Sequence, residues 1–158
     1  MIILLTACNI DKIDNTPKKK VEEYLYQYQT LSDDVLSDLN LTVEREIELD
    51  DYKNEYIEIM KNNFKNMTYV IKDEMKDGDK SNVEVEITVN NFVDAINDCK
   101  KKETFENITK CKIEKMKKVK EKIKYTIYFI VKKDINNNWQ VEDLSEEDED
   151  KLLGVYTG

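Results

Sequence analysis

Three cysteines and no histidine limit the chemistry available to this chain of 158 residues. Two of the cysteines, Cys99 and Cys111, lie 12 residues apart. In one continuous helix their backbones would be separated by roughly 18 Å, beyond the reach of a disulfide bond. A turn near residues 101–104 would instead fold two helical arms together and allow the bond. The alternative is two small buried thiols, so the sequence leaves both arrangements open.

The missing histidine removes the commonest general base and the commonest metal ligand. The composition therefore argues against hydrolytic triads and most zinc chemistry, and we identify no catalytic residue and no cofactor. A calcium-loop pattern runs from Asp73 to Glu84, but Met75 stands at its third ligand position and cannot bind a hard cation. The flanking residues alternate as in strands, so we expect Asp77-Gly78-Asp79 to form a turn and predict no metal site.

The remaining cysteine, Cys8, ends the segment Leu5-Thr6-Ala7-Cys8, which resembles the bacterial lipobox. In that motif small residues let the peptidase approach the backbone, and the thiol takes a diacylglyceryl group. We expect residues 1–7 to be a truncated signal remnant that lacks a basic start, and residues 8–16 to be a polar tether. The resemblance implies an extracytoplasmic lipoprotein, held on the cell membrane by acylated Cys8. The alternative is a cytosolic protein whose first residues form an edge strand and whose Cys8 is a buried thiol.

Charge is distributed unevenly along the chain. The net charge of −9 argues against a nucleic-acid partner, because such a protein needs a basic surface. Residues 100–124 nevertheless contain 11 Lys and 4 Glu, a net charge of +7 that leaves −16 on the rest. The predicted basic surface consists of Lys112, Lys115, Lys117, Lys118, Lys120 and Lys122. It is either a contact for anionic lipid or anionic wall polymer, or a solvated helix face that balances an acidic body.

Residues 17–64 carry the apolar spacing of amphipathic helices. Thr16 and Pro17 are a favoured N-cap and a favoured first helical residue. Apolar residues then recur every three or four positions from Val21 to Leu39, which predicts one helix of about six turns. A second stripe, over residues 52–64, predicts another amphipathic helix.

After residue 66 the apolar period changes to two, which is typical of strands. Near the C-terminus, Ser145 with Asp148 resembles a capping box and predicts a short terminal helix. The acidic residues 146–150 lie at the start of that helix, where the helix dipole stabilises negative charge. The expected elements before it are a hairpin of residues 67–71 and 83–89, helical pieces 92–102 and 105–122, a strand at 123–131 and a last strand at 139–141.

This order predicts a single α+β domain over residues 17–158. Its N-terminal helices pack on a curved antiparallel sheet of about four strands, with a helical insertion between the two hairpins. The chain resembles small Gram-positive lipoproteins carrying a domain of unknown function of the nuclear transport factor 2-like, cystatin-like cone type. The residues that carry this resemblance are Thr16-Pro17, Val21, Tyr24, Leu25, Tyr28, Leu31, Asp77-Gly78-Asp79, Tyr125-Thr126-Ile127, Trp139, Asp143-Leu144-Ser145 and Gly154 to Tyr156.

The resemblance implies a pocket between the sheet and the helices, and some relatives of this type are isomerases or dehydratases. Their chemistry needs a buried Asp or His with a Tyr partner, whereas the tyrosines of this chain occupy expected core positions. We therefore expect a non-enzymatic ligand-binding or protein-interaction module, with an isomerase- or dehydratase-like enzyme as the alternative. A closed, tyrosine-filled interior favours the module, and an open cavity with a lone buried carboxylate favours the enzyme.

Tyr128 and Ile130 lie on the outward side of the predicted strand at residues 123–131, opposite to Tyr125 and Ile127. A sheet covered by helices on one side should show polar residues to water on the other. Because related cone folds often pair through this face, we expect a weak homodimer that buries Tyr128 and Ile130. The alternative is that the helical insertion, residues 92–122, folds over this face within one chain.

Overall fold

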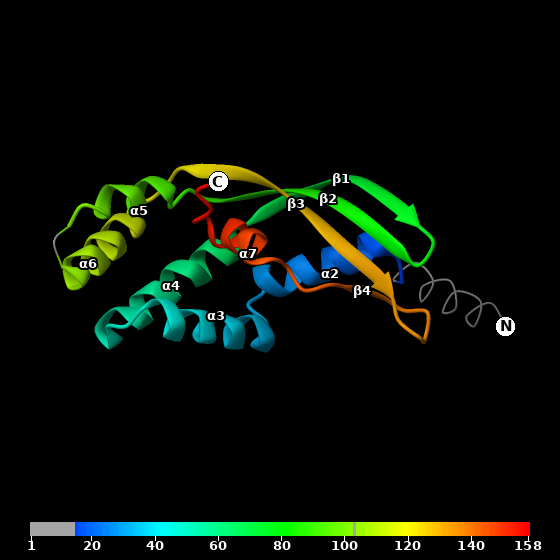
Figure 1. Cartoon of the computed structure of the whole chain (residues 1–158), viewed down its shortest axis with the longest axis horizontal. Helices are drawn as coiled ribbons and strands as arrows, with labels where there is room; N and C mark the ends of the chain where they lie inside the picture. Colours follow the sequence, from blue (N-terminus) through cyan, green and yellow to red (C-terminus); the bar gives the residue numbers. More distant parts are fainter. Residues whose placement is uncertain (1–14, 103) are drawn as a thin grey trace.

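The computed structural model describes residues 15–102 and 104–158, which form helices and one open antiparallel sheet (Figure 1). The predicted α+β class is confirmed, with four strands in the order β1-β2-β3-β4. No helix among the described residues is long and apolar enough to cross a membrane. The elements are α2 (Pro17–Gln29), α3 (Asp33–Glu46), α4 (Asp50–Asn66), β1 (Thr68–Asp77), β2 (Lys80–Asn90), α5 (Val93–Cys99), α6 (Phe105–Met116), β3 (Lys122–Lys133), β4 (Trp139–Val141) and α7 (Glu146–Leu153).

The predicted helix of six turns is wrong, because two helices, α2 and α3, occupy that stretch. Leu31 has a φ of 53°, a left-handed conformation that interrupts the helical hydrogen-bond series. Ser32 then caps α3 by accepting a hydrogen bond from the backbone N–H of Val35 (3.3 Å). The break redirects the apolar stripe: α2 buries Val21 and Leu25 against the sheet, whereas α3 packs with α4.

The sheet is built from two long antiparallel pairings. The first hairpin is confirmed, with β1 and β2 joined at a turn in which Gly78 has a φ of 60°. β2 pairs with β3 along its whole length, whereas the short β4 pairs only with the last residues of β3. The inward side chains of the two central strands are fully buried and form the core with α2: Val83, Val85, Ile87, Val89, Ile127, Phe129 and Val131.

The insertion between β2 and β3 consists of the short helices α5 and α6, at one end of the sheet (Figure 1). A disulfide bond joins Cys99, the last residue of α5, to Cys111 of α6, and their Cα atoms are 5.7 Å apart. α6 ends at Met116, so the prediction of a helix as far as residue 122 is wrong. The chain leaves the helix there because residue 122 already pairs with the end of β2.

The outer face of the sheet is open to solvent in the described part of the chain. Tyr128 and Ile130 point away from the helices and are 57% and 40% exposed. The alternative in which the insertion covers this face is wrong, because α5 packs with α6, and α6 packs with α4 at the end of the sheet. Val70 and Met75 of β1 are exposed as well, so two strands contribute apolar side chains to the outer face.

Candidate functional site

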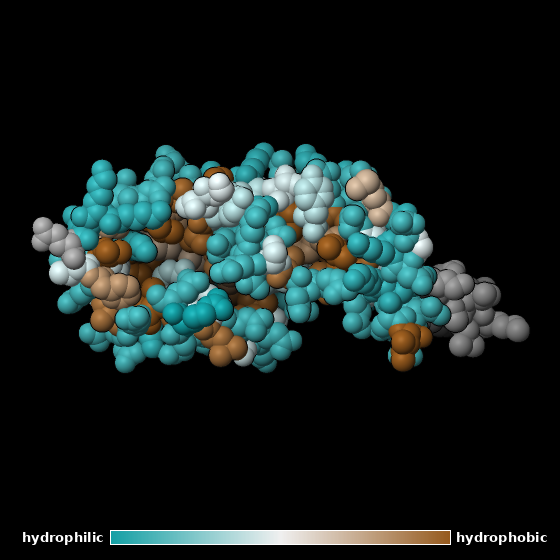
Figure 2. Space-filling view, in the orientation of Figure 1, coloured by the Kyte–Doolittle hydropathy of each residue, from teal (hydrophilic) through white to brown (hydrophobic). Residues whose placement is uncertain are grey.

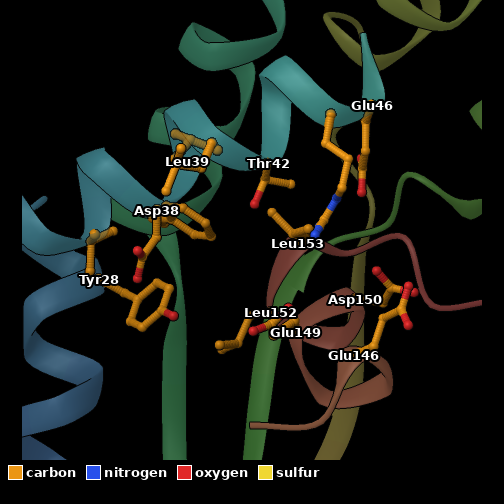
Figure 3. A pocket seen from close by; sticks show the side chains of 14 residues that line it. Tyr28, Asp38, Leu39, Thr42, Glu46, Glu146, Glu149, Asp150, Leu152 and Leu153 are labelled. Carbon is orange, nitrogen blue, oxygen red and sulfur yellow. The ribbon is translucent and has the colours of Figure 1, made fainter. Parts of the chain in front are cut away.

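A pocket of about 280 Å³ opens between α3 and α7, with α2 and α4 beneath it. A pocket with an apolar floor at the junction of several elements is a common place for a small ligand. In Figure 3, Leu152 and Leu153 of α7 lie on the side of that helix that faces α3. The apolar floor comes from four elements: Tyr28 of α2, Leu39 of α3, Phe64 of α4, and Leu152 and Leu153 of α7.

Five carboxylates surround the opening of this pocket. Among the described residues none of the five forms an ion pair. Arg45 is the one basic residue in the described lining, so the rim carries an excess of negative charge. Figure 3 shows the two groups facing each other across the opening: Asp38 and Glu46 on α3, and Glu146, Glu149 and Asp150 on α7.

Three of these carboxyl groups hold their protons more tightly than usual. Partial burial raises the pKa of Glu46. The positive charge of Arg45 opposes this rise, and the negative charge of Asp150 adds to it. Partial burial is also the main reason for the raised pKa of Glu149, again opposed by Arg45. The pKa of Asp150 is raised first by partial burial and then by the negative charge of Glu146. A cation bound at the rim would favour the charged form of these carboxyl groups and would lower their raised pKa values.

The position of α7 depends on a buried amide, Asn63 of α4. Its Nδ2 donates to the carbonyl oxygen of Leu152 (3.0 Å), and its Oδ1 accepts from the backbone N–H of Asn90 (2.9 Å). One side chain therefore joins α4, the end of β2 and α7. Because Asn63 is fully buried, no water replaces either hydrogen bond if the amide is removed.

The two ends of α7 are fixed by local backbone chemistry. Ser145 caps the start by accepting a hydrogen bond from the N–H of Asp148 (3.2 Å), as the sequence predicts. Gly154 ends the helix with a φ of 75° and accepts a hydrogen bond from the N–H of Phe92 (3.0 Å). A Cβ at Gly154 would lie 2.1 Å from the carbonyl oxygen of Asn90, so only glycine allows this approach.

Two half-buried tyrosines of α2 pack between the helices and the sheet. Tyr24 packs edge-on against Phe129, and Tyr28 packs edge-on against Phe64, with ring centroids 5.6 Å and 5.1 Å apart. The hydroxyl oxygens of Tyr24 and Tyr28 are 3.3 Å apart and share a hydrogen bond. Burial is the main reason that the pKa of each phenol is raised, so both stay neutral at physiological pH.

The predicted site residues lie away from the pocket. Cys8 is outside the described residues. The prediction that the lysines share one helix is wrong, because α6 ends before most of them. Two of the lysines are already paired, Lys115 with Asp98 (3.2 Å) and Lys117 with Glu55 (2.6 Å). Their places along the chain are Lys112 and Lys115 in α6, Lys117, Lys118 and Lys120 in the connection, and Lys122 in β3.

The acidic pocket could not be predicted from the sequence because its two halves are far apart along the chain. Asp38 and Glu46 have a spacing that places both on one face of α3. The helix dipole is a sound explanation for an acidic run at the start of α7, but it does not reveal that α3 faces the same helix. Only the return of α7 onto α4 brings the carboxylates together.

Comparison with protein-family models, curated proteins and solved structures finds no match for this chain. Among the described residues, no three or more His, Cys, Asp or Glu side chains are arranged to hold a metal ion. The charge of the pocket and its apolar floor are therefore the features from which a function is inferred.

Proposed function

We propose that this protein is an extracytoplasmic lipoprotein whose single domain binds a ligand without catalysing a reaction. The proposed anchor is supported by Leu5-Thr6-Ala7-Cys8, in which two small residues stand directly before the acceptor cysteine. Residues 9–14, four of which are Asn, Asp or Lys, suit a tether between an acylated Cys8 and Asn15, the first described residue. A domain of the nuclear transport factor 2-like cone type is supported by helices packed on one face of an antiparallel sheet.

The acidic pocket is the observation that carries the ligand class. Its floor takes apolar surface out of water, and its rim offers unpaired carboxylates around a single guanidinium. A small organic cation, with an ammonium group and a short alkyl body, satisfies both properties. The ammonium group would lie near Glu149 and Asp150, and the alkyl body would lie over Leu152 and Leu153. We therefore propose an aliphatic amine as the ligand class.

The alternative, an isomerase- or dehydratase-like enzyme, has less support. Such an enzyme needs an acid or base buried beside its substrate. The carboxylates of the pocket stand at its rim, where all five are exposed or half-buried, and the hydroxyl groups of Tyr24 and Tyr28 hydrogen-bond to each other. The absence of a buried acid among the described lining residues favours a binding module.

Titration calorimetry with cadaverine, a short alkyl diamine, tests the ligand class. We expect binding that weakens with added salt and falls by about tenfold or more in the variant Glu149→Gln/Asp150→Asn, since each lost charge contact of 1.4 kcal/mol is a factor of ten. Glu114→Gln, on the exposed side of α6, is the matched control and should bind as the wild type does. Equal binding of the uncharged diol of the same length would contradict the proposal.

Cell fractionation tests the anchor. The variant Cys8→Ser should move from the membrane fraction to the soluble fraction, because the thiol that would take the lipid is gone. Globomycin, which inhibits the lipoprotein signal peptidase, should cause the precursor of the wild type to accumulate. Thr6→Ser keeps a small residue before the cysteine and should stay in the membrane fraction. A Cys8→Ser protein that fractionates like the wild type would show that there is no lipid anchor at this position.

A further inference from the structure

The turn between β3 and β4 exposes one apolar side chain almost completely. Ile135 is 98% exposed, compared with 68% for Leu41, the next most exposed large hydrophobic residue. Single apolar residues on a surface are common, so exposure alone decides nothing. Figure 2 shows an apolar projection at this turn, surrounded by hydrophilic residues.

The turn is rigid, because Asp134 satisfies its backbone. Oδ1 of Asp134 accepts hydrogen bonds from the N–H groups of Asn136 (2.8 Å) and Asn138 (3.0 Å). The N–H of Asp134 donates to the carbonyl oxygen of Asn138 (2.9 Å), and its carbonyl oxygen accepts from the N–H of Asn137 (3.1 Å). This network holds Ile135 at the tip, although burial of its side chain would be favourable.

The described chain enters the fold at the same turn. Oδ1 of Asn15 accepts a hydrogen bond from the N–H of Trp139 (2.9 Å), and Nδ2 of Asn15 donates to the carbonyl oxygen of Asn137 (2.9 Å). Only six residues lie between Cys8 and Asn15. The seven Cα–Cα steps from Cys8 to Asn15 span at most about 25 Å, so a lipid on Cys8 would keep the turn within that distance of the bilayer surface.

We propose that the β3–β4 turn lies in the membrane interface, with the side chain of Ile135 among the lipid headgroups. This inference rests on the proposed lipid anchor, and the partner is the bilayer that holds that anchor. The contact fixes the orientation of the domain, because a second point of attachment beside the tether prevents free rotation. β3, whose 12 residues span roughly 40 Å along the strand, then holds the insertion at the end that is farther from the turn.

The apolar side chain, and not charge, carries this contact. Four lysines stand at this end of the sheet, and three aspartates offset most of their charge. Anionic lipid is therefore not needed, and a zwitterionic bilayer should suffice. The lysines are Lys76, Lys80, Lys132 and Lys133, and the aspartates are Asp77, Asp79 and Asp134.

Fluorescence of the full lipidated chain in phosphatidylcholine vesicles tests the proposal. The variants Asn136→Cys, which keeps Ile135, and Leu41→Cys each give one thiol for labelling with nitrobenzoxadiazole, since both positions are exposed and Cys99 and Cys111 are bonded. We expect the label at position 136 to emit at shorter wavelength and to be quenched severalfold more by spin-labelled lipid than the label at position 41, and adding Ile135→Asp to the Asn136→Cys protein should abolish this difference. Circular dichroism of both labelled proteins checks that the fold is kept.

The possible failures can be told apart. If the labelled protein stays with the vesicles but the label at position 136 is quenched no more than the label at position 41, the anchor stands and the turn contact is wrong. If the protein does not stay with the vesicles, the proposed anchor fails and the turn contact fails with it. Quenching that appears only when anionic lipid is added would show that lysines carry the contact, which overturns the role of Ile135.

Discussion

Gly154 combines a left-handed backbone with a close approach to β2, and mutation can separate these two constraints. In Gly154→Ala the positive φ of 75° would strain the backbone of an alanine, and the new Cβ would clash with the carbonyl oxygen of Asn90, 2.1 Å away. We expect a loss of roughly 3–4 kcal/mol in the free energy of unfolding. Gly78→Ala is the matched control, since its φ is 60° and nothing lies within 4 Å of its Cβ position. That variant should lose about 1–2 kcal/mol.

Urea denaturation of the two glycine variants measures both losses. Equal losses would show that the contact between Gly154 and Asn90 does not restrict the residue type, and that backbone conformation alone requires glycine.

The rim carboxylates Glu46, Glu149 and Asp150 should make the pocket more stable in mild acid. Each has a pKa raised in the folded chain above its unfolded value. Between these two pKa values the folded chain therefore binds more protons than the unfolded chain. The resulting gain in the free energy of unfolding grows as the pH falls through the folded pKa, and it is complete below the unfolded pKa. Solvent screens these partly exposed groups, and we expect a gain below about 1 kcal/mol.

Thermal melting of Glu149→Gln/Asp150→Asn against the wild type isolates this contribution. The variant should be the more stable protein near pH 7, and the difference should shrink as the pH falls toward about 4. Asp50 is the control of opposite sign, because hydrogen bonding to Lys53 lowers its pKa. Asp50→Asn should therefore be less stable than the wild type at pH 7. A pocket variant with unchanged melting at every pH would contradict the raised pKa values of Glu149 and Asp150.

Among the elements, α5 and α6 depend most on a covalent bond. They have 7 and 12 residues, lengths at which isolated helices are marginal in water. Replacing both Cys99 and Cys111 by serine should lower the free energy of unfolding by about 3 kcal/mol at most. Hydrogen exchange should show faster exchange at residues 93–116, with β2 and β3 unchanged. Reductant should not change the hydrogen exchange of the double variant, because that variant has no disulfide to reduce. If β2 lost as much protection as residues 93–116, the insertion would be part of the central core.

Elements with strong local signals could be predicted from the sequence, and the others could not. Thr16 caps α2 as expected, with its Oγ1 accepting from the N–H of Lys19 (3.1 Å), and Gly78 forms the expected turn. The break at Leu31 could not be predicted, because the apolar spacing continues through it and leucine gives no signal for a positive φ. Elements were thus predictable where neighbouring residues determine the backbone conformation, and breaks set by tertiary packing were not.

At the scale of the whole molecule, the acidic pocket could not be predicted, because α3 and α7 meet only after the sheet has formed. The whole fold also places two surfaces at opposite ends of the domain. Asn15 contacts the β3–β4 turn, whereas the insertion lies at the opposite end of β3. In an anchored protein the lysines of the insertion would therefore face away from the bilayer. An anionic wall polymer is a better proposal for their partner than lipid.

The outer face of the sheet is a further candidate surface for binding a partner. Val70, Met75, Tyr128 and Ile130 expose apolar side chains there. Glu84 of β2 lies between these strands, and its carboxylate accepts a hydrogen bond from the hydroxyl of Tyr128 (3.4 Å). Polar groups within so small a patch limit the apolar area that pairing can bury, which predicts a weak dimer.

We expect the wild type to dimerise at high micromolar concentration and Ile130→Lys to stay monomeric, because a buried unpaired ammonium group opposes contact of two apolar faces. Leu41→Lys, an exposed residue of α3, is the control and should dimerise normally. Sedimentation velocity across a concentration series distinguishes them. A two-fold axis along the strands would place both β3–β4 turns at the same end, so two anchors could share one bilayer. A wild type that is monomeric at every concentration would exclude the dimer.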